Sequence, residues 1–172
     1  MANSNFGSIL VIGYGNSLRS DDGAGCQVAD IVASWHLPYV RSLTVHQLTP
    51  ELAEPIAASE LTIFIDAYAG EFIKKRDKLA IQVKKIAIAK SELVTHGNSS
   101  ILTGVGHFSD PRSLLLLSQQ IYGKTPTAYT LLLPAVNWEF GEQISAVTRK
   151  SIEQAVDFLR NLCTKLVSSS QC

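Results

Sequence analysis

Residues Ser8 to Gly23 read SILVIGYGNSLRSDDG, and this stretch decides the fold. Its first half, Ser8 to Tyr14, is a continuous apolar run that stops at glycines, which is typical of a strand buried on both faces of a parallel sheet. Apolar residues then recur at helical spacing and predict a helix from about Asp22 to Trp35, with Asp21 near its start as a cap. A buried strand followed directly by a helix indicates an α/β fold.

The rest of the chain repeats this alternation. Further strands are expected at Val40 to His46, Leu61 to Ile65, Leu79 to Ile86 and Thr127 to Leu133, the third of these at an edge of the sheet. Further helices are expected at Thr49 to Ser59, at Asp110 to Tyr122 and after Ser145 through Leu166. The pattern predicts one α/β domain over residues 1–172, with a twisted, mostly parallel sheet, helices on both faces and a flexible tail from about 167 to 172.

Composition narrows the classes of partner. The chain has 172 residues, enough for one domain with a single core, and 15 Lys and Arg balance 15 Asp and Glu. Without net charge, no general attraction to nucleic acid or to an anionic membrane is expected. No apolar run approaches the roughly 20 residues that span a bilayer, and Met1 to Ser8 lacks the features of a signal peptide. A cytoplasmic location is therefore expected.

The three cysteines are few and odd in number, and they have no CxxC spacing. This argues against both a disulfide framework and a zinc knuckle. Cys26 and Cys163 fall on apolar faces of predicted helices, and Cys172 ends the chain. We expect all three to be core or tail thiols that take no part in catalysis.

The glycines between Gly13 and Gly23 superficially resemble a dinucleotide-binding fingerprint. However, Leu18 replaces the third glycine of GxGxxG, and the second strand ends in His46 and Gln47 instead of an acid that would bind a ribose. The lysine of a phosphate-binding loop is also absent, and the acid pair at the helix start already supplies negative charge where a phosphate would bind. Nucleotide binding is not expected.

Two acids and a histidine stand at connections that follow the predicted strands. Asp22 and Asp66 each come after a strand expected to be central, so their carboxylates can converge, and His107 precedes the Asp110 helix at a connection that can reach the same place. Two carboxylates and an imidazole suit zinc or nickel, and a carboxylate pair can also activate water without metal. The pattern leaves structural roles open: a helix cap for Asp22, a strand-end turn for Asp66 and a surface position for His107.

Three segments carry a family resemblance. They are IGYGNSLRSDDGAG at 12–25, FIDA at 64–67 and GH at 106–107. They resemble the hydrogenase maturation endopeptidases, whose first signature is close to GxGNxLxxDDGxG. The segments HQLTPELAE at 46–54, LLPA at 132–135 and WEFGEQIS at 138–145 look like the branch that serves bidirectional, NAD-linked hydrogenases. The similarity spans about Ile9 to Leu159.

The resemblance implies a five-stranded twisted sheet and an endopeptidase that removes the C-terminal extension from the nickel-loaded large-subunit precursor of a nickel-iron hydrogenase. It implies that Asp22, Asp66 and His107 contact nickel carried by the substrate, that no cofactor is permanently bound, and that the precursor is the partner of a protein expected to be a monomer. Many relatives have an acid and glycines after the second strand, where this chain has His46, Gln47 and Leu48. The role of that acid is not carried over, and His46 and His96 are further candidates.

Two other functions stay open. One is a non-catalytic nickel-binding assembly chaperone that uses the same three ligands. The other is a hydrolase such as a peptidyl-tRNA hydrolase, whose glycine-asparagine loop looks similar, although the balanced charge and the second acid Asp22 count against it. For the protease, the sequence does not choose between metal activation of water and direct general-base action by a carboxylate.

Overall fold

The computed structural model describes residues 8–69, 80–89 and 110–169, with side chains through residue 166. Its strands form one sheet in the order β2-β1-β3-β5-β4, namely β1 (Ile9–Tyr14), β2 (Val40–Val45), β3 (Leu61–Ala69), β4 (Gln82–Lys85) and β5 (Thr127–Ala135). The helices are α1 (Ala24–Ala33), α2 (Ala53–Ala57), α5 (Pro111–Tyr122) and α6 (Ala146–Ser169), with short 3-10 helices η1 (Ser20–Gly23) and η2 (Pro50–Leu52). The other strands pair in parallel, and only β4 runs antiparallel, along β5. The predicted α/β fold with a five-stranded, mostly parallel sheet is confirmed.

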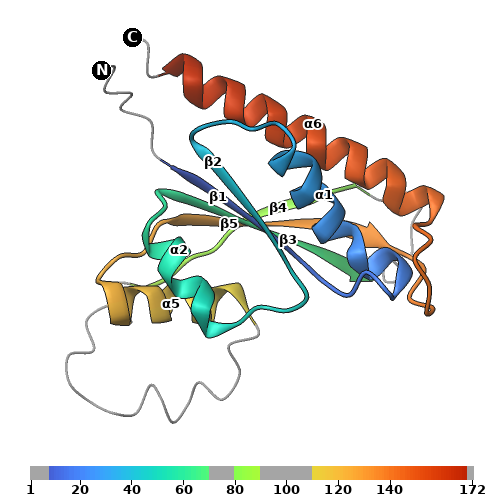
Figure 1. The fold of residues 1–172 in the computed structure, drawn as a ribbon, viewed down its shortest axis with the longest axis horizontal. Helices are drawn as coiled ribbons and strands as arrows, with labels where there is room; N and C mark the ends of the chain where they lie inside the picture. The colour runs from blue at the N-terminus through green and yellow to red at the C-terminus, as the bar shows by residue number, and fades with distance from the viewer. Residues whose placement is uncertain (1–7, 70–79, 90–109, 170–172) are drawn as a thin grey trace.

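Helices cover both faces of the sheet, as the continuously apolar strands predict. Along β1, Ile9 and Val11 pack with α1 and α6, whereas Leu10 and Ile12 pack with α2 and α5. Figure 1 shows this arrangement, with α1 and α6 on one side of the strands and α2 and α5 on the other. Successive side chains of a strand point to opposite faces, so a strand buried on both faces needs apolar residues at every position.

Two glycines of the opening stretch bring α1 close to the sheet. A Cβ atom at Gly25 would lie 2.4 Å from the carbonyl oxygen of Ile65, and one at Gly13 would lie 2.1 Å from the carbonyl oxygen of Gly25. Carbon and oxygen atoms that are not bonded cannot approach so closely without displacing the backbone. Glycine at both positions therefore fixes the spacing of β1, β3 and the first helix.

The start of the first helix differs from the prediction. Instead of a helix from Asp22 capped by Asp21, the chain forms the 3-10 helix η1 and then α1, and no side chain caps either start. The Asp21 side chain is fully buried and turns toward the segment that follows β5. The capping prediction was wrong because backbone N–H groups more than a hundred positions away bind this carboxylate.

The end of β3 also differs. Asp66 was expected to follow the strand, but β3 continues to Ala69 because β5 pairs with it throughout, with Asp66 opposite Leu132. The pairing of β1 with β3 ends earlier, at Ile65. Asp66 therefore lies inside a strand, at the point where β1 has ended and β5 continues.

Other local predictions are confirmed. The β4 strand lies at the sheet edge, although it is shorter than expected. Asp110 caps α5 by accepting a hydrogen bond from the Ser113 N–H at 3.0 Å, and Ser145 accepts one from the Thr148 N–H at 3.2 Å before α6.

The α6 helix runs to Ser169, beyond the expected start of the tail, and residues 170–172 lie outside the described part. No described helix has both the length and the apolar character needed to cross a membrane.

Candidate functional site

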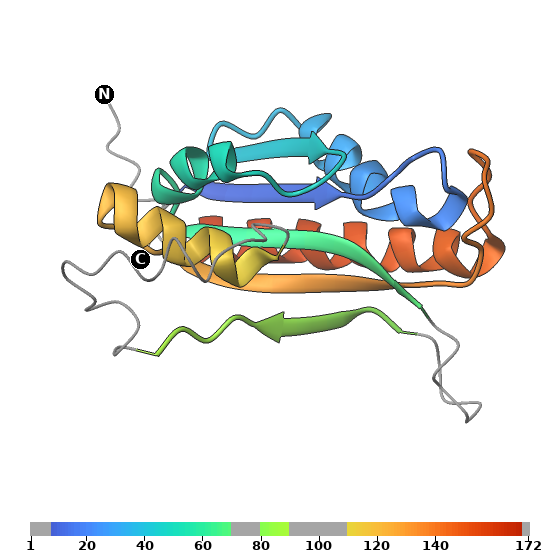
Figure 2. The same cartoon turned by 90° about the horizontal axis from the view of Figure 1, so that it is seen from below.

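The carboxyl ends of the central strands meet two loops that lie far apart in the sequence. Residues 15–23 connect β1 to α1, and residues 136–145 connect β5 to α6. Figure 2 shows β1, β3 and β5 pointing toward the same end of the molecule, where both loops lie. This is the end at which parallel α/β sheets bind their ligands.

Asp66 is a half-buried carboxylate with two hydrogen-bond donors. Its Oδ1 accepts a bond from the Ala67 N–H at 2.8 Å, and its side chain accepts a second one from the Tyr14 hydroxyl. Burial raises the pKa of Asp66 to about 6, the two hydrogen bonds oppose this shift, and the charge of Asp22 adds to it. The group is therefore largely ionised at neutral pH yet titrates within two units of it.

Asp22 is held by the turn that precedes it. Its Oδ2 accepts a hydrogen bond from the Asn16 N–H at 2.9 Å, and the Asn16 side chain in turn accepts one from the Leu18 N–H at 2.9 Å. Gly15 permits this turn, because its φ is +136° and a Cβ atom there would lie 2.0 Å from the Asp22 carbonyl oxygen. The charge of Asp22 acts on Asp66, so the two predicted acids lie within electrostatic reach of each other.

Tyr14 joins the acids, and sequence reasoning did not single it out. Gly13 pairs with Ile65, so Tyr14 and Asp66 come next on neighbouring strands. Burial raises the pKa of Tyr14 strongly, and the charge of Asp66, their hydrogen bond and the charge of Asp110 add to the shift. The available signal was its position, since it ends the first strand between the glycines of the opening motif.

Of the three histidines that the sequence offered as candidates, only His46 lies within the described residues. His107 and His96 lie outside them, so the convergence of His107 with the two acids stays a prediction. His46 is exposed and follows Val45, which pairs with Tyr14. Within the part that the structure describes, no three His, Cys, Asp or Glu side chains are grouped so as to hold a metal ion.

Cys26 lies on α1 close to the acid pair and is 7% exposed. Its sulfur is 3.5 Å from the Gly15 carbonyl oxygen and 3.6 Å from that of Val45. Burial raises its pKa to about 11, and the charges of Asp30, Asp22 and Asp66 add to the shift. A thiol that stays protonated at neutral pH is a poor nucleophile. Cys163 is also buried, with a pKa raised by burial, and Cys172 lies outside the described residues.

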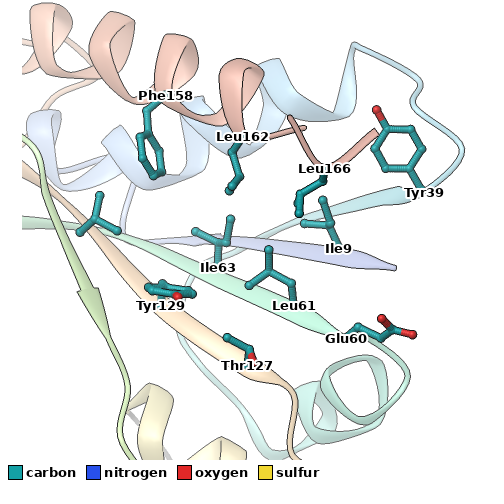
Figure 3. A pocket seen from close by; sticks show the side chains of 11 residues that line it. Ile9, Tyr39, Glu60, Leu61, Ile63, Thr127, Tyr129, Phe158, Leu162 and Leu166 are labelled. Atoms are coloured by element: carbon teal, nitrogen blue, oxygen red, sulfur yellow. The ribbon is translucent and has the colours of Figure 1, made fainter. Parts of the chain in front are cut away.

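An apolar hollow of about 540 Å³ lies at the other end of the sheet, where β1, β3 and β5 begin. The first residues of three strands, Ile9, Leu61 and Thr127, line it together with Phe158 and Leu162 of α6. Figure 3 shows the α6 side chains pointing toward those of the strands. Because Asp22 and Asp66 belong to the opposite, carboxyl ends, this hollow contributes no group to the acid pair.

Comparison with known proteins shows that this chain is similar to several solved structures in its fold. No family model and no curated protein matches the sequence. Among solved structures, the nickel-iron hydrogenase maturation protease HybD from Thermococcus kodakarensis superposes with a TM-score of 0.64 at 19% identity, over 90% of this chain and 98% of that one. The hydrogenase maturating endopeptidase HybD from Escherichia coli gives 0.63 at 17% identity, over 92% and 93%.

A hydrogenase 2 maturation peptidase from a Thaumarchaeota archaeon gives 0.61 at 20% identity, over 91% of this chain and 97% of that one. These likenesses cover nearly the whole length of both partners. At such identities they establish that this chain has the fold of those proteins.

Proposed function

We propose that this protein is an endopeptidase that removes the C-terminal extension from the nickel-loaded large-subunit precursor of a nickel-iron hydrogenase. Its fold is that of proteins named as hydrogenase maturation proteases. The opening motif GYGNSLRSDDG resembles the first signature of that family. The observation that carries the proposal is the placement of Asp22 and Asp66 at the carboxyl ends of neighbouring central strands, near enough for the charge of Asp22 to act on Asp66.

The acid pair suits a divalent cation that arrives with the substrate. Carboxylate oxygens bind such ions when ionised, and two of them can share one ion. Nickel held by the precursor is the ion that we propose they contact, with no cofactor permanently bound to this protein. Recognition of the metal would confine cleavage to precursors that have already been loaded.

His107 is proposed as the third contact to nickel. Asp110, the first described residue after it, is close enough to Tyr14 for its charge to raise the Tyr14 pKa. The chain thus enters α5 near the acid pair, three positions after His107. An imidazole added to two carboxylates gives a mixed nitrogen and oxygen ligand set that suits nickel.

Cleavage requires water to attack the scissile carbonyl carbon and a proton to reach the leaving amine nitrogen as the C–N bond breaks. An ionised Asp66 or Asp22 can take the proton from water and return it to the amine, or the substrate's metal can activate the water. Either route needs an ionised carboxylate. Tyr14 would orient Asp66 through its hydroxyl in both cases.

Finer assignments belong to the same proposal. The segments 46–54 and 138–145 support the branch that serves bidirectional, NAD-linked hydrogenases. We also propose that it acts in the cytoplasm with the precursor as its partner, and the balanced charge of the chain gives no general attraction to nucleic acid or to an anionic membrane. We propose that the protein acts on the precursor as a monomer.

The proposal is tested by the intact mass of a purified large-subunit precursor after incubation with the protein, with and without nickel loading. We expect the nickel-loaded precursor to lose the mass of a C-terminal peptide and the nickel-free precursor to keep its mass. For substitutions of Asp22 or Asp66 in this assay, Asp157→Asn is a suitable control, because Asp157 is an exposed acid on α6, away from the site.

Two outcomes would contradict the proposal. Nickel delivered to the precursor without any loss of mass would identify an assembly chaperone. An unchanged precursor in every mixture, with the protein folded, would exclude the protease.

A further inference from the structure

Two large apolar side chains are exposed on the two loops at the carboxyl ends of the central strands. Phe140 is 83% exposed and Leu18 is 46% exposed. Phe140 belongs to the loop after β5, and Leu18 belongs to the loop after β1 that also carries Asp22. Neither side chain contributes to the apolar cores of the two helix layers.

The two residues are neighbours across a short parallel bridge. Arg19 pairs with Gly141, with Gly141 N–H donating to the Leu18 carbonyl at 2.8 Å and Ser20 N–H donating to the Gly141 carbonyl at 2.7 Å. Leu18 and Phe140 both immediately precede the paired residues. The backbone segments that carry Leu18 and Phe140 therefore lie side by side. Figures 1 and 2 both show the loop after β5 beside η1.

The backbone that carries Phe140 is held on both sides. The Glu139 carbonyl accepts a bond from the Ser20 hydroxyl at 3.0 Å, and Gly141 adopts a φ of +152° that favours glycine. Asp21 binds the N–H groups of Val136 and Ser145, near the two ends of the loop. Exposed apolar groups on such a fixed backbone lose little conformational entropy when a partner covers them.

Charged residues adjoin this pair along the chain. Arg19, Glu139 and Glu142 are exposed next to it in the sequence, and they carry both signs of charge. An aromatic centre with a polar rim is the usual composition of a protein–protein contact. The pair also adjoins the acid site, because Leu18 N–H is bonded to the Asn16 side chain and Asn16 N–H to the Asp22 carboxylate.

We infer that Leu18 and Phe140 form a docking surface for an apolar segment of the folded large-subunit precursor, outside the bond that is cleaved. The inference rests on the proposed function and adds a binding role for residues that carry no reacting group. The surface shares the connection of residues 15–23 with Asp22, so a protein bound to it is held next to the acid pair. The occupant is the precursor, since it must be bound at this end of the sheet in any case.

The test is steady-state cleavage of nickel-loaded precursor by the wild type, Leu18→Ser, Phe140→Ser and the double variant. We expect KM to rise by about tenfold for Phe140→Ser, which removes an aromatic anchor, and more for the double variant, while kcat stays within about twofold. Ile121→Ser is the matched control, because Ile121 is 58% exposed on α5 and belongs to neither loop. Its KM should equal that of the wild type.

The outcomes separate this inference from the proposed function. If the wild type cleaves the precursor and both single variants keep its KM, the docking surface is refuted while the protease stands. If the wild type leaves the precursor intact, the proposed function fails and the inference fails with it. Self-association of the wild type that Phe140→Ser abolishes, with an unchanged KM, would assign the surface to a second copy of this chain and refute the inference.

Discussion

The buried carboxylate of Asp21 accepts hydrogen bonds from both the backbone N–H and the hydroxyl of Ser145, at 2.7 and 2.8 Å. The same carboxylate also accepts the N–H groups of Val136 and Asn137, at 2.9 and 2.8 Å. One side chain at the start of η1 thus fastens both ends of the loop between β5 and α6. Its neighbour Asp22 belongs to the acid pair, so the two adjacent acids have different roles.

Asp21→Asn should lower the free energy of unfolding by about 2 to 3 kcal/mol, because an amide cannot accept all four bonds and hydrogen bonds to a charged group are worth about 1.5 to 3 kcal/mol each. For a chain of this size the melting temperature should fall by about 4 to 10 °C. Thermal melts of wild type and variant measure this. Equal melting temperatures would show that the loop is held by other contacts, and Asp157→Asn serves as the exposed control.

The pH dependence of that difference has a definite sign. Burial tends to raise the pKa of Asp21, but hydrogen bonds from Ser145, Val136 and Asn137 outweigh it, and the pKa lies below its ordinary value. A carboxyl with a depressed folded pKa adds stability above its unfolded pKa of about 3.9 and loses it as the pH falls further. The gap in melting temperature should therefore be full at pH 7 and shrink below about pH 4.

Features that depend on residues close together in the sequence could be predicted. Features that depend on pairing between distant segments could not. The Asp110 cap depends only on residues within one helical turn, and it is present as predicted. The roles of Asp21 and the end of β3 depend on the segment from Thr127 to Ser145, which a local pattern cannot locate. The nearness of Asp22 to Asp66 followed from parallel strand order, whereas the contact of Tyr14 with Asp66 needed the register of β1 on β3.

Gly25→Ala should destabilise the protein by about 3 kcal/mol or more, because the new Cβ atom would meet backbone oxygens of Ile65 and Tyr14 that cannot rotate away. Gly123→Ala is the comparison, since nothing lies within 4 Å of a Cβ atom there. An alanine at the Gly123 φ of +69° should lower the free energy of unfolding by only about 1 kcal/mol. Chemical denaturation of both variants tests the difference, and equal losses would mean that α1 can shift away from the sheet.

Thiol alkylation should leave cleavage intact. Cys26 and Cys163 are buried with raised pKa values, about 11 for Cys26, so little thiolate exists at pH 8 to react with iodoacetamide. Peptide mass spectrometry of the treated native protein should find both residues unmodified, and denatured protein provides the positive control. Loss of cleavage in a treated protein that remains folded would make a cysteine essential.

Asp66→Asn should reduce removal of the C-terminal extension to a few per cent of the wild-type rate or less, with the fold retained. Asparagine keeps the size of the side chain and can still accept the bond from Ala67 N–H. It loses the negative charge, which both metal contact and general-base action require. If Asp66 had only a structural role, the amide would serve nearly as well. Undiminished cleavage by a folded variant, measured as precursor mass loss, would remove Asp66 from the site.

The ionisation of Asp66 can be followed without substrate, through the carboxyl carbon chemical shift in ¹³C-labelled protein. The wild type should titrate with a pKa of about 6, above the unfolded value of about 3.9. The raised value means that Asp66 favours the folded state most below pH 3.9 and that this contribution is lost as the pH rises through 6. Cleavage should depend on pH in the opposite sense to this stability contribution. We expect kcat/KM to fall as the pH drops below about 6, because the protonated acid cannot contact a cation.

Two substitutions should move this pKa in opposite directions. Tyr14→Phe removes a hydrogen bond that favours the ionised form, so the Asp66 pKa should rise. Asp22→Asn removes a neighbouring negative charge that disfavours ionisation, so the pKa should fall. A purely structural loosening of the site would expose Asp66 to water and lower its pKa in both variants, because burial is the main cause of the raised value. Opposite shifts therefore require the hydrogen bond and the charge pair to act on Asp66 separately. A fall in the Asp66 pKa in Tyr14→Phe would contradict the contact between Tyr14 and Asp66, and a rise in Asp22→Asn would contradict the action of the Asp22 charge.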